Sequence, residues 1–165
     1  VHDKDGISAA LCFAEMAAAL DAAGSSVMAR LEAIYREHGL YVTKQHSLKI
    51  DPAAEGGSIG EKLRAAKPKE VAGRAVETLV DLDAGLKRHA DGSEEQVSLP
   101  QSDVLIFHLA EGARVIVRPS GTEPKVKCYY ELRVPMGADE SLAAAEARAA
   151  QLLEALVERH QGELG

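Results

Sequence analysis

The sequence predicts an α+β fold in which an antiparallel sheet is covered by helices on one face. Three observations lead to this prediction. Apolar and polar residues alternate in consecutive runs between residues 104 and 132, which is typical of half-buried strands. An apolar stripe at helical spacing follows near the C-terminus, and two shorter helical patterns precede the first strand-like run. Because short turns separate the strand-like runs, we expect antiparallel pairing.

The first forty residues predict a pair of helices. Residues 7–23 have apolar side chains at helical spacing, and Gly24 supplies a stop. Ser25 or Ser26 can cap a second helix, which ends at Gly39. The two stripes consist of Ile7, Leu11, Ala14 and Ala18, and of Val27, Leu31, Ile34 and Tyr35. This alanine-rich hairpin has little of its own to bury against. We therefore expect an exposed apolar face, unless the hairpin packs on the C-terminal part or on another copy.

The segment of residues 41–50 is strand-like but polar. We place here the crossover between an N-terminal part, residues 1–40, and a C-terminal part, residues 41–165. Lys44 is a candidate to face a cleft between the two parts and to meet a phosphate there. The simpler alternative is a solvated lysine on a strand.

Shorter elements are expected in the middle of the chain. The spacing of Ser58 and Glu61 is that of a capping box, before a short helix that ends at Pro68. Residues 75–82 are interpreted as a strand between two glycine-containing turns. Residues 89–102 are rich in Asp, Gly, Ser, Glu and Gln, and they indicate a mobile loop.

The segment of residues 118–125, RPSGTEPK, joins two strand-like runs and has the residues that a phosphate site needs. Arg118 can offer a planar fork of donors to two phosphate oxygens, and Lys125 adds a point charge. Ser120 and Thr122 add hydroxyl donors. Gly121 can take φ > 0 and turn successive backbone N–H groups into one concavity. A well-built surface turn is the alternative, since Pro, Ser and Gly are turn residues in any case.

The patterns on either side of this loop place it at the end of a sheet. The strand after the loop has an apolar face made of Val126, Cys128, Tyr130 and Leu132. Its other, wetter face is made of Lys125, Lys127, Tyr129 and Glu131. Against Glu123, the cations Arg114, Arg118, Lys125 and Lys127 form a local positive patch in an acidic chain. The final helix is predicted from a stripe of Leu142, Ala145, Ala149, Leu152, Leu153 and Leu156.

Composition excludes several classes of function. The chain has 165 residues, enough for one domain or one domain plus a fragment. A net charge of −7 without a long basic run makes it a poor binder of nucleic acid. No run of about 18 apolar residues occurs, so no membrane span is expected. The six histidines are dispersed without the spacing of a helical metal site. Cys12 and Cys128 are expected to be buried free thiols, which favours the cytoplasm.

Residues 118–125 resemble the phosphate-binding loop of the α-D-phosphohexomutases, the superfamily of phosphoglucomutases and phosphomannomutases. Residues 125–132 resemble the strand after that loop, especially in the branch that contains phosphoglucomutase 2 and phosphopentomutase. Residues 3–10 resemble the segment that opens a helix in the third domain of these enzymes. The resemblance implies that residues 1–40 are the C-terminal remnant of an α/β third domain. Residues 41–165 would then be the phosphate-binding fourth domain, with a TATA-binding-protein-like fold. Because this domain would bind the 1- and the 6-phosphate alternately, the resemblance also implies a hinge near residues 40–50.

The resemblance also implies a reaction. These enzymes interconvert 1- and 6-phosphosugars through a phosphoserine and a bisphosphate intermediate, with Mg²⁺ and an activator of the glucose 1,6-bisphosphate type. The nucleophile, the Mg²⁺ loop and the sugar-recognition loop lie in parts of the family's sequence that we do not find here. The isolated chain is therefore expected to be inactive. The implied phosphate-binding residues are Arg118, Ser120, Gly121, Thr122, Lys125 and Lys44.

The expected partners are a phosphosugar, the N-terminal domains of the same polypeptide and a second copy bound through the helical hairpin. Two alternatives to this function stay open. In the first, Ser120 is the nucleophile of a small hydrolase with His108 as a distant base, although no Gly-x-Ser-x-Gly elbow is present. In the second, the chain is a stand-alone module that binds a phosphorylated ligand and has no catalytic parent.

Overall fold

The computed structural model describes residues 4–49, 59–119 and 125–164. Its helices are α1 (Gly6–Ala22), α2 (Val27–His38), α3 (Ile59–Ala66) and α4 (Leu142–Leu164), with a short 3₁₀ turn η1 (Ala110–Gly112). Its strands are β1 (Leu40–Lys49), β2 (Glu70–Val71), β3 (Arg74–Asp81), β4 (Leu86–His89), β5 (Glu94–Gln96), β6 (Leu105–Leu109), β7 (Ala113–Pro119) and β8 (Lys125–Val134).

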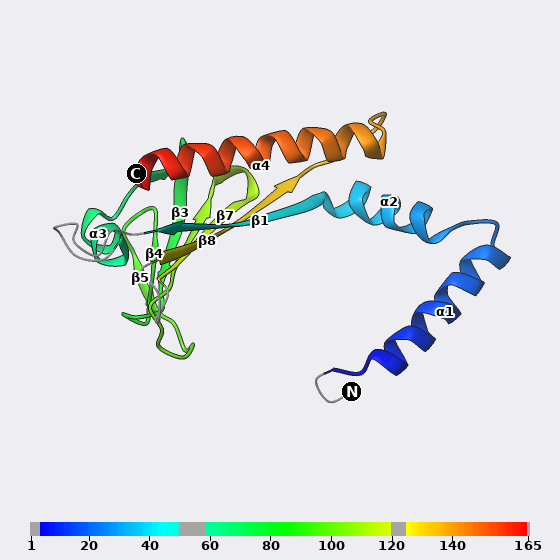
Figure 1. Cartoon of the computed structure of the whole chain (residues 1–165), viewed down its shortest axis with the longest axis horizontal. Coiled ribbons are helices and arrows are strands. Elements are labelled where there is room, and N and C mark those ends of the chain that lie inside the picture. The colour runs from blue at the N-terminus through cyan, green and yellow to red at the C-terminus, as the bar shows by residue number, and fades with distance from the viewer. Residues whose placement is uncertain (1–3, 50–58, 120–124, 165) are drawn as a thin grey trace.

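The strands form one antiparallel sheet, and α4 lies along one of its faces (Figure 1). The strand order is β1-β8-β7-β6-β3-β4-β5, and β2 pairs with the first two residues of β3. Consecutive strands from β6 to β8 are neighbours joined by short connections, as the alternating patterns predict. The predicted α+β class, with an antiparallel sheet and helices, is confirmed.

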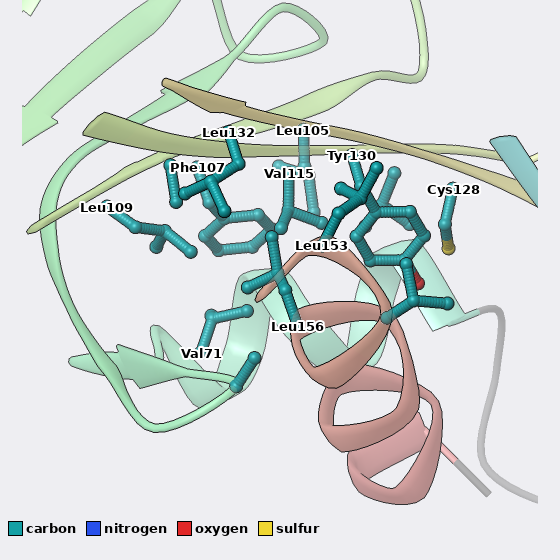
Figure 2. Close-up of a cluster of buried hydrophobic side chains, with 14 of the residues drawn as sticks. Val71, Leu105, Phe107, Leu109, Val115, Cys128, Tyr130, Leu132, Leu153 and Leu156 are labelled. Atoms are coloured by element: carbon teal, nitrogen blue, oxygen red, sulfur yellow. The ribbon is translucent and has the colours of Figure 1, made fainter. Parts of the chain in front are cut away.

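The core lies between the sheet and α4 (Figure 2). Phe107, Val115 and Tyr130 project from three neighbouring strands toward Leu153 and Leu156 of the helix. The residues of α4 that are buried against the sheet are Ala145, Ala149, Leu153, Leu156, Val157 and His160. Their spacing confirms the predicted stripe except at Leu142, which is half-buried, and at Leu152, which is exposed. Burial of this aliphatic set supplies the main driving force for the fold.

The predicted loop at residues 89–102 is wrong in part, because this segment contains β5. Residues Glu94–Gln96 pair with β4 to form a hairpin at the sheet edge. Lys87 Nζ contacts Glu95 Oε1 at 2.7 Å, and Arg88 Nη2 contacts Glu94 Oε1 at 2.6 Å. Because ion pairs rather than apolar pairs join these strands, the hairpin has no alternating hydrophobic pattern to recognise.

The two N-terminal helices form as predicted, and both have side-chain caps, but they are bent by 95° relative to each other and so do not pack as the expected hairpin. Asp5 Oδ1 accepts a hydrogen bond from Ser8 N at 3.0 Å, and Ser26 Oγ accepts one from Ala29 N at 3.1 Å. The helices project beyond the sheet (Figure 1), and neither contains a buried residue. The expected exposed apolar face is therefore present. Cys12 lies on this exposed helix, so the expectation that it is buried was wrong, whereas Cys128 is buried as expected.

Helix α2 is nevertheless attached to the sheet domain. The Arg36 guanidinium donates hydrogen bonds to the carbonyl oxygens of Ala138, at 2.9 Å, and of Glu140, at 3.0 Å. Arg133 Nε donates to the carbonyl oxygen of His38 at 2.6 Å. All ten residues of β1 then pair with β8, so the described part of the expected hinge near residues 40–50 is a strand of the sheet.

A helix that crosses a bilayer must be both long and apolar. None of the described helices is, singly, long and apolar enough to cross a bilayer; α1 and α2 reach that length and apolarity only together, as a pair bent by 95°.

Candidate phosphate site

The loop proposed from the sequence connects two neighbouring strands. β7 ends at Pro119, which is in register with Val126 near the start of β8. The segment between them, which contains Ser120, Gly121 and Thr122, lies outside the described residues. The contributions of these three residues to phosphate binding therefore stay predictions. The described site consists of the strand residues at the base of the loop.

Two pairs of cations face each other across the strands at this end of the sheet. Arg118 of β7 lies directly opposite Lys127 of β8. Lys125 of β8 lies directly opposite Lys49 of β1. Directly paired residues share a face, and so do residues two apart on one strand. The four side chains therefore start from the same face, which is opposite to the face that α4 covers. We call Lys49, Arg118, Lys125 and Lys127 the cationic cluster.

Like charges directly opposite each other in a sheet are unfavourable, so acidic neighbours or a bound anion must offset them. Within the part of the chain that the structure describes, neither Arg118 nor Lys127 nor Lys49 makes an ion pair. Arg118 and Lys49 are exposed, and Lys127 is half-buried. Arg118, Lys127 and Lys49 thus carry positive charge that no ion pair among the described residues compensates, and this charge favours the binding of an anion.

Arg114, the fourth cation of the patch predicted from the sequence, is different. It lies on the same face, but its Nη2 donates to Glu131 Oε2 at 2.8 Å, directly across β8. Its charge is therefore compensated within the sheet. Among the described residues of β7 and β8, Glu131 is the acidic side chain, and it pairs with Arg114. The cations nearer the loop, Arg118 and Lys127, face each other, so positive charge is concentrated at the loop end of the two strands.

His108, the candidate base of the hydrolase alternative, lies well back from the end of β7. It is in register with Arg114, four residues before Arg118 along β7, which corresponds to about 13 Å of strand. Burial lowers the pKa of His108, and the positive charge of Arg114 lowers it further. This placement disfavours the hydrolase alternative.

Lys44 is the predicted site residue that the structure does not bring to the cluster. It lies opposite Tyr130, on the face covered by α4. Its Nζ forms an ion pair with Glu154 of that helix. Arg118 and Lys127 start from the other face, so Lys44 and the cluster are separated by the sheet itself. A role for Lys44 in binding phosphate stays a prediction.

Lys49 was not found as a site residue from the sequence. It comes from a strand about 75 residues before Lys125, and nothing in the alternation of residues 41–50 shows which strand β1 will join. The only signal is the polar face of that segment, which the sequence shares with many solvated strands. Metal binding has no comparable support: the described residues contain no group of three or more His, Cys, Asp or Glu side chains placed to hold a metal ion.

Comparisons with known proteins agree with this picture. Residues 60–155 match the family model of the phosphoglucomutase/phosphomannomutase C-terminal domain. The chain is 37% identical to a probable phosphomannomutase of Haemophilus influenzae over 87% of this chain and 27% of that protein. It is 33% identical to the phosphopentomutase of Homo sapiens over 83% of this chain and 23% of that protein.

A third relative, the glucose 1,6-bisphosphate synthase of Mus musculus, is 30% identical over 96% of this chain and 26% of that protein. The chain thus spans about a quarter of the length of the curated relatives it matches. The family model covers more than half of the chain, from α3 to the middle of α4. The chain therefore belongs to the phosphoglucomutase/phosphomannomutase family and contains its C-terminal domain.

Proposed function

We propose that this chain binds the substrate phosphate in a phosphomutase that interconverts 1- and 6-phosphosugars. The observation that carries the proposal is that Arg118 lies directly opposite Lys127 in the sheet, with Lys49 and Lys125 paired beside them, at the base of the RPSGTEPK loop. Such an arrangement is unfavourable in an empty sheet and favourable around a doubly charged phosphate. The family relationship and the names of the relatives, which include a phosphomannomutase and a phosphopentomutase, support the same conclusion.

Within this proposal the chain positions the substrate and does not transfer the phosphoryl group. Arg118 is the anchor, because its guanidinium can bind two phosphate oxygens at once. Ser120, Thr122 and the backbone N–H of Gly121 complete the cradle, and Lys125 adds charge. They hold the phosphate that is not reacting, so that remote binding energy orients the sugar at the phosphoserine. Transfer proceeds through a bisphosphate intermediate, and the isolated chain is inactive.

The remaining components of the proposal lie outside this chain. The described residues offer no carboxylate cluster, so they do not fit Mg²⁺. An activator of the glucose 1,6-bisphosphate type would supply the bisphosphate. The partners proposed are the phosphosugar, N-terminal domains of the same polypeptide and, through the exposed helices α1 and α2, a second copy. The proposed location is the cytoplasm.

The proposal is tested by titrating the chain with inorganic phosphate while its backbone amide shifts are followed. We expect the amides of residues 118–127 and Lys49 to move at millimolar phosphate, and Arg118→Ala to weaken binding by roughly 10- to 100-fold. Lys69→Ala is the matched control, because it removes one exposed positive charge. Lys69 accepts a hydrogen bond from Val76 N, at the opposite end of the sheet. Unmoved amides, or equal losses in the two variants, would contradict the site.

A further inference from the structure

Helix α3 contacts the strand residue that precedes the phosphate loop. An ideal Cβ on Gly60 would lie 3.7 Å from Pro119 Cγ, 3.2 Å from Arg64 Nη1 and 3.2 Å from Asp103 Oδ1. Gly60 is buried, whereas Ile59 and Leu63 pack against the hydrophobic core. The first turn of α3 thus lies between the core and Pro119. A Cβ at Gly60 would crowd the side chains of Arg64 and Asp103 and would make ordinary van der Waals contact with Pro119.

Arg64 holds this helix in place from its other end. Its Nε donates to Asp81 Oδ2 at 3.0 Å, and its Nη2 donates to Asp103 Oδ1 at 2.7 Å. Asp81 ends β3 and also accepts hydrogen bonds from the backbone N–H groups of Asp83 and Ala84. The guanidinium therefore joins α3 to two separate segments of the sheet domain. Two charge-assisted bonds in a fixed fork restrain a helix more than a single point charge can.

From this arrangement we propose that Arg64 is a positioning residue for the phosphate site. By fixing α3 against Asp81 and Asp103, it holds the first turn of α3 beside Pro119 and so positions the end of β7, which carries Arg118. The inference rests on the proposed function, because it assigns Arg64 to the same phosphate. Arg64 itself is not in the cationic cluster: its two acidic partners compensate its charge.

A phosphate site loses affinity when a donor such as Arg118 is displaced by about an ångström. Arg64→Gln should weaken phosphate binding by the chain on the order of tenfold and shift the Arg118 and Lys125 amides in the absence of phosphate. Arg64→Lys keeps the charge but loses the fork, so its affinity should lie between those of wild type and Arg64→Gln. Gly60→Ala should reproduce the amide shifts while leaving every charge unchanged.

The matched control is Arg74→Gln. Arg74 is also a half-buried arginine of the sheet domain that bonds both a carboxylate and a second acceptor, here Glu111 Oε2 at 2.7 Å and the carbonyl oxygen of Ala110 at 3.2 Å. Its side chain is 17% exposed, against 21% for Arg64, and it lies at the other end of β3. If Arg64 served stability alone, both variants would lower the unfolding free energy and neither would change phosphate affinity.

The outcomes separate this inference from the proposed function. If wild-type chain fails to bind phosphate, the proposed function fails and the inference fails with it. If wild type binds and Arg64→Gln and Gly60→Ala bind equally well, the positioning role alone is overturned. In the full-length enzyme, Arg64→Gln should raise KM and lower kcat for the phosphosugar, whereas Arg74→Gln should leave both unchanged. Should Arg64→Gln fail to fold, Arg64→Lys and Gly60→Ala decide the question.

Discussion

The hydroxyl of Tyr130 lies 2.9 Å from Nδ1 of His160, and both side chains are almost completely buried between the sheet and α4. The two rings meet edge to face, with centroids 5.5 Å apart. This hydrogen bond joins β8 to the last turns of α4. It satisfies two polar groups that would otherwise be buried at a cost.

Tyr130→Phe removes one partner and leaves the ring nitrogen of His160 buried without it. We expect the free energy of unfolding to fall by about 1–3 kcal/mol, measured by urea denaturation. Tyr129→Phe is the control, since Tyr129 is the neighbouring residue on the other face and is half-buried. Its loss should stay within about 0.5 kcal/mol. Equal losses in the two variants would show that the Tyr130–His160 bond contributes nothing specific.

The same histidine should make stability depend on pH. Burial lowers the pKa of His160 from 6.5 to about 4 in the folded chain. Between these values the unfolded chain binds the proton and the folded chain does not, so stability falls as pH falls from 6.5 toward 4. The loss should approach about 3 kcal/mol by pH 4. His160→Gln should be less stable at neutral pH and should lose this contribution; an unchanged slope in that variant would contradict the assignment.

The two thiols should differ in reactivity. Cys12 lies on the exposed α1, whereas burial raises the pKa of Cys128 to about 11. A thiol reagent should therefore modify Cys12 rapidly in the folded chain and reach Cys128 only after unfolding. The measurement is the number of thiols modified per chain with and without denaturant. Rapid modification of Cys12→Ser would contradict the placement of Cys128.

Loss of Arg118 should affect both kinetic constants of the full-length enzyme. Arg118→Ala is expected to raise KM for the phosphosugar and to lower kcat, because orientation is lost together with binding. The combined effect on kcat/KM should be roughly 10- to 100-fold. Arg88→Ala is the comparison, since Arg88 lies in the edge hairpin and pairs with Glu94. Similar losses in both variants would indicate a general effect of charge.

Lys44 provides a test of placement by face. Because its ammonium pairs with Glu154 on the helix-covered face, we expect Lys44→Met to leave phosphate affinity within about twofold of wild type. Lys127→Met, on the cluster face, should weaken it by roughly tenfold or more. Phosphate titration of the two variants in parallel gives the answer. A larger loss in Lys44→Met than in Lys127→Met would restore Lys44 to the site.

The features that could be predicted from the sequence are those that leave a local pattern of residues. Val126, Cys128, Tyr130 and Leu132 alternate with polar residues because one face of β8 packs on α4, so strand, face and core were all predictable there. The pairing of β1 with β8 could not be predicted, since strand pairing between distant segments leaves no local pattern. For that reason Lys49 was missed and the face of Lys44 was left open. The hairpin of β4 and β5 was missed because ion pairs join it.

The pairing of β1 with β8 has a mechanical consequence. β1 begins directly after the Gly39 that closes α2, and it ends at Lys49 in the cationic cluster. One strand of ten residues, about 33 Å long, thus connects helix α2 to the cationic cluster. The full ladder of β1 with β8 makes this connection stiff. A displacement of α2 is therefore expected to shift β1 along β8 and to change the register that places Lys49 opposite Lys125.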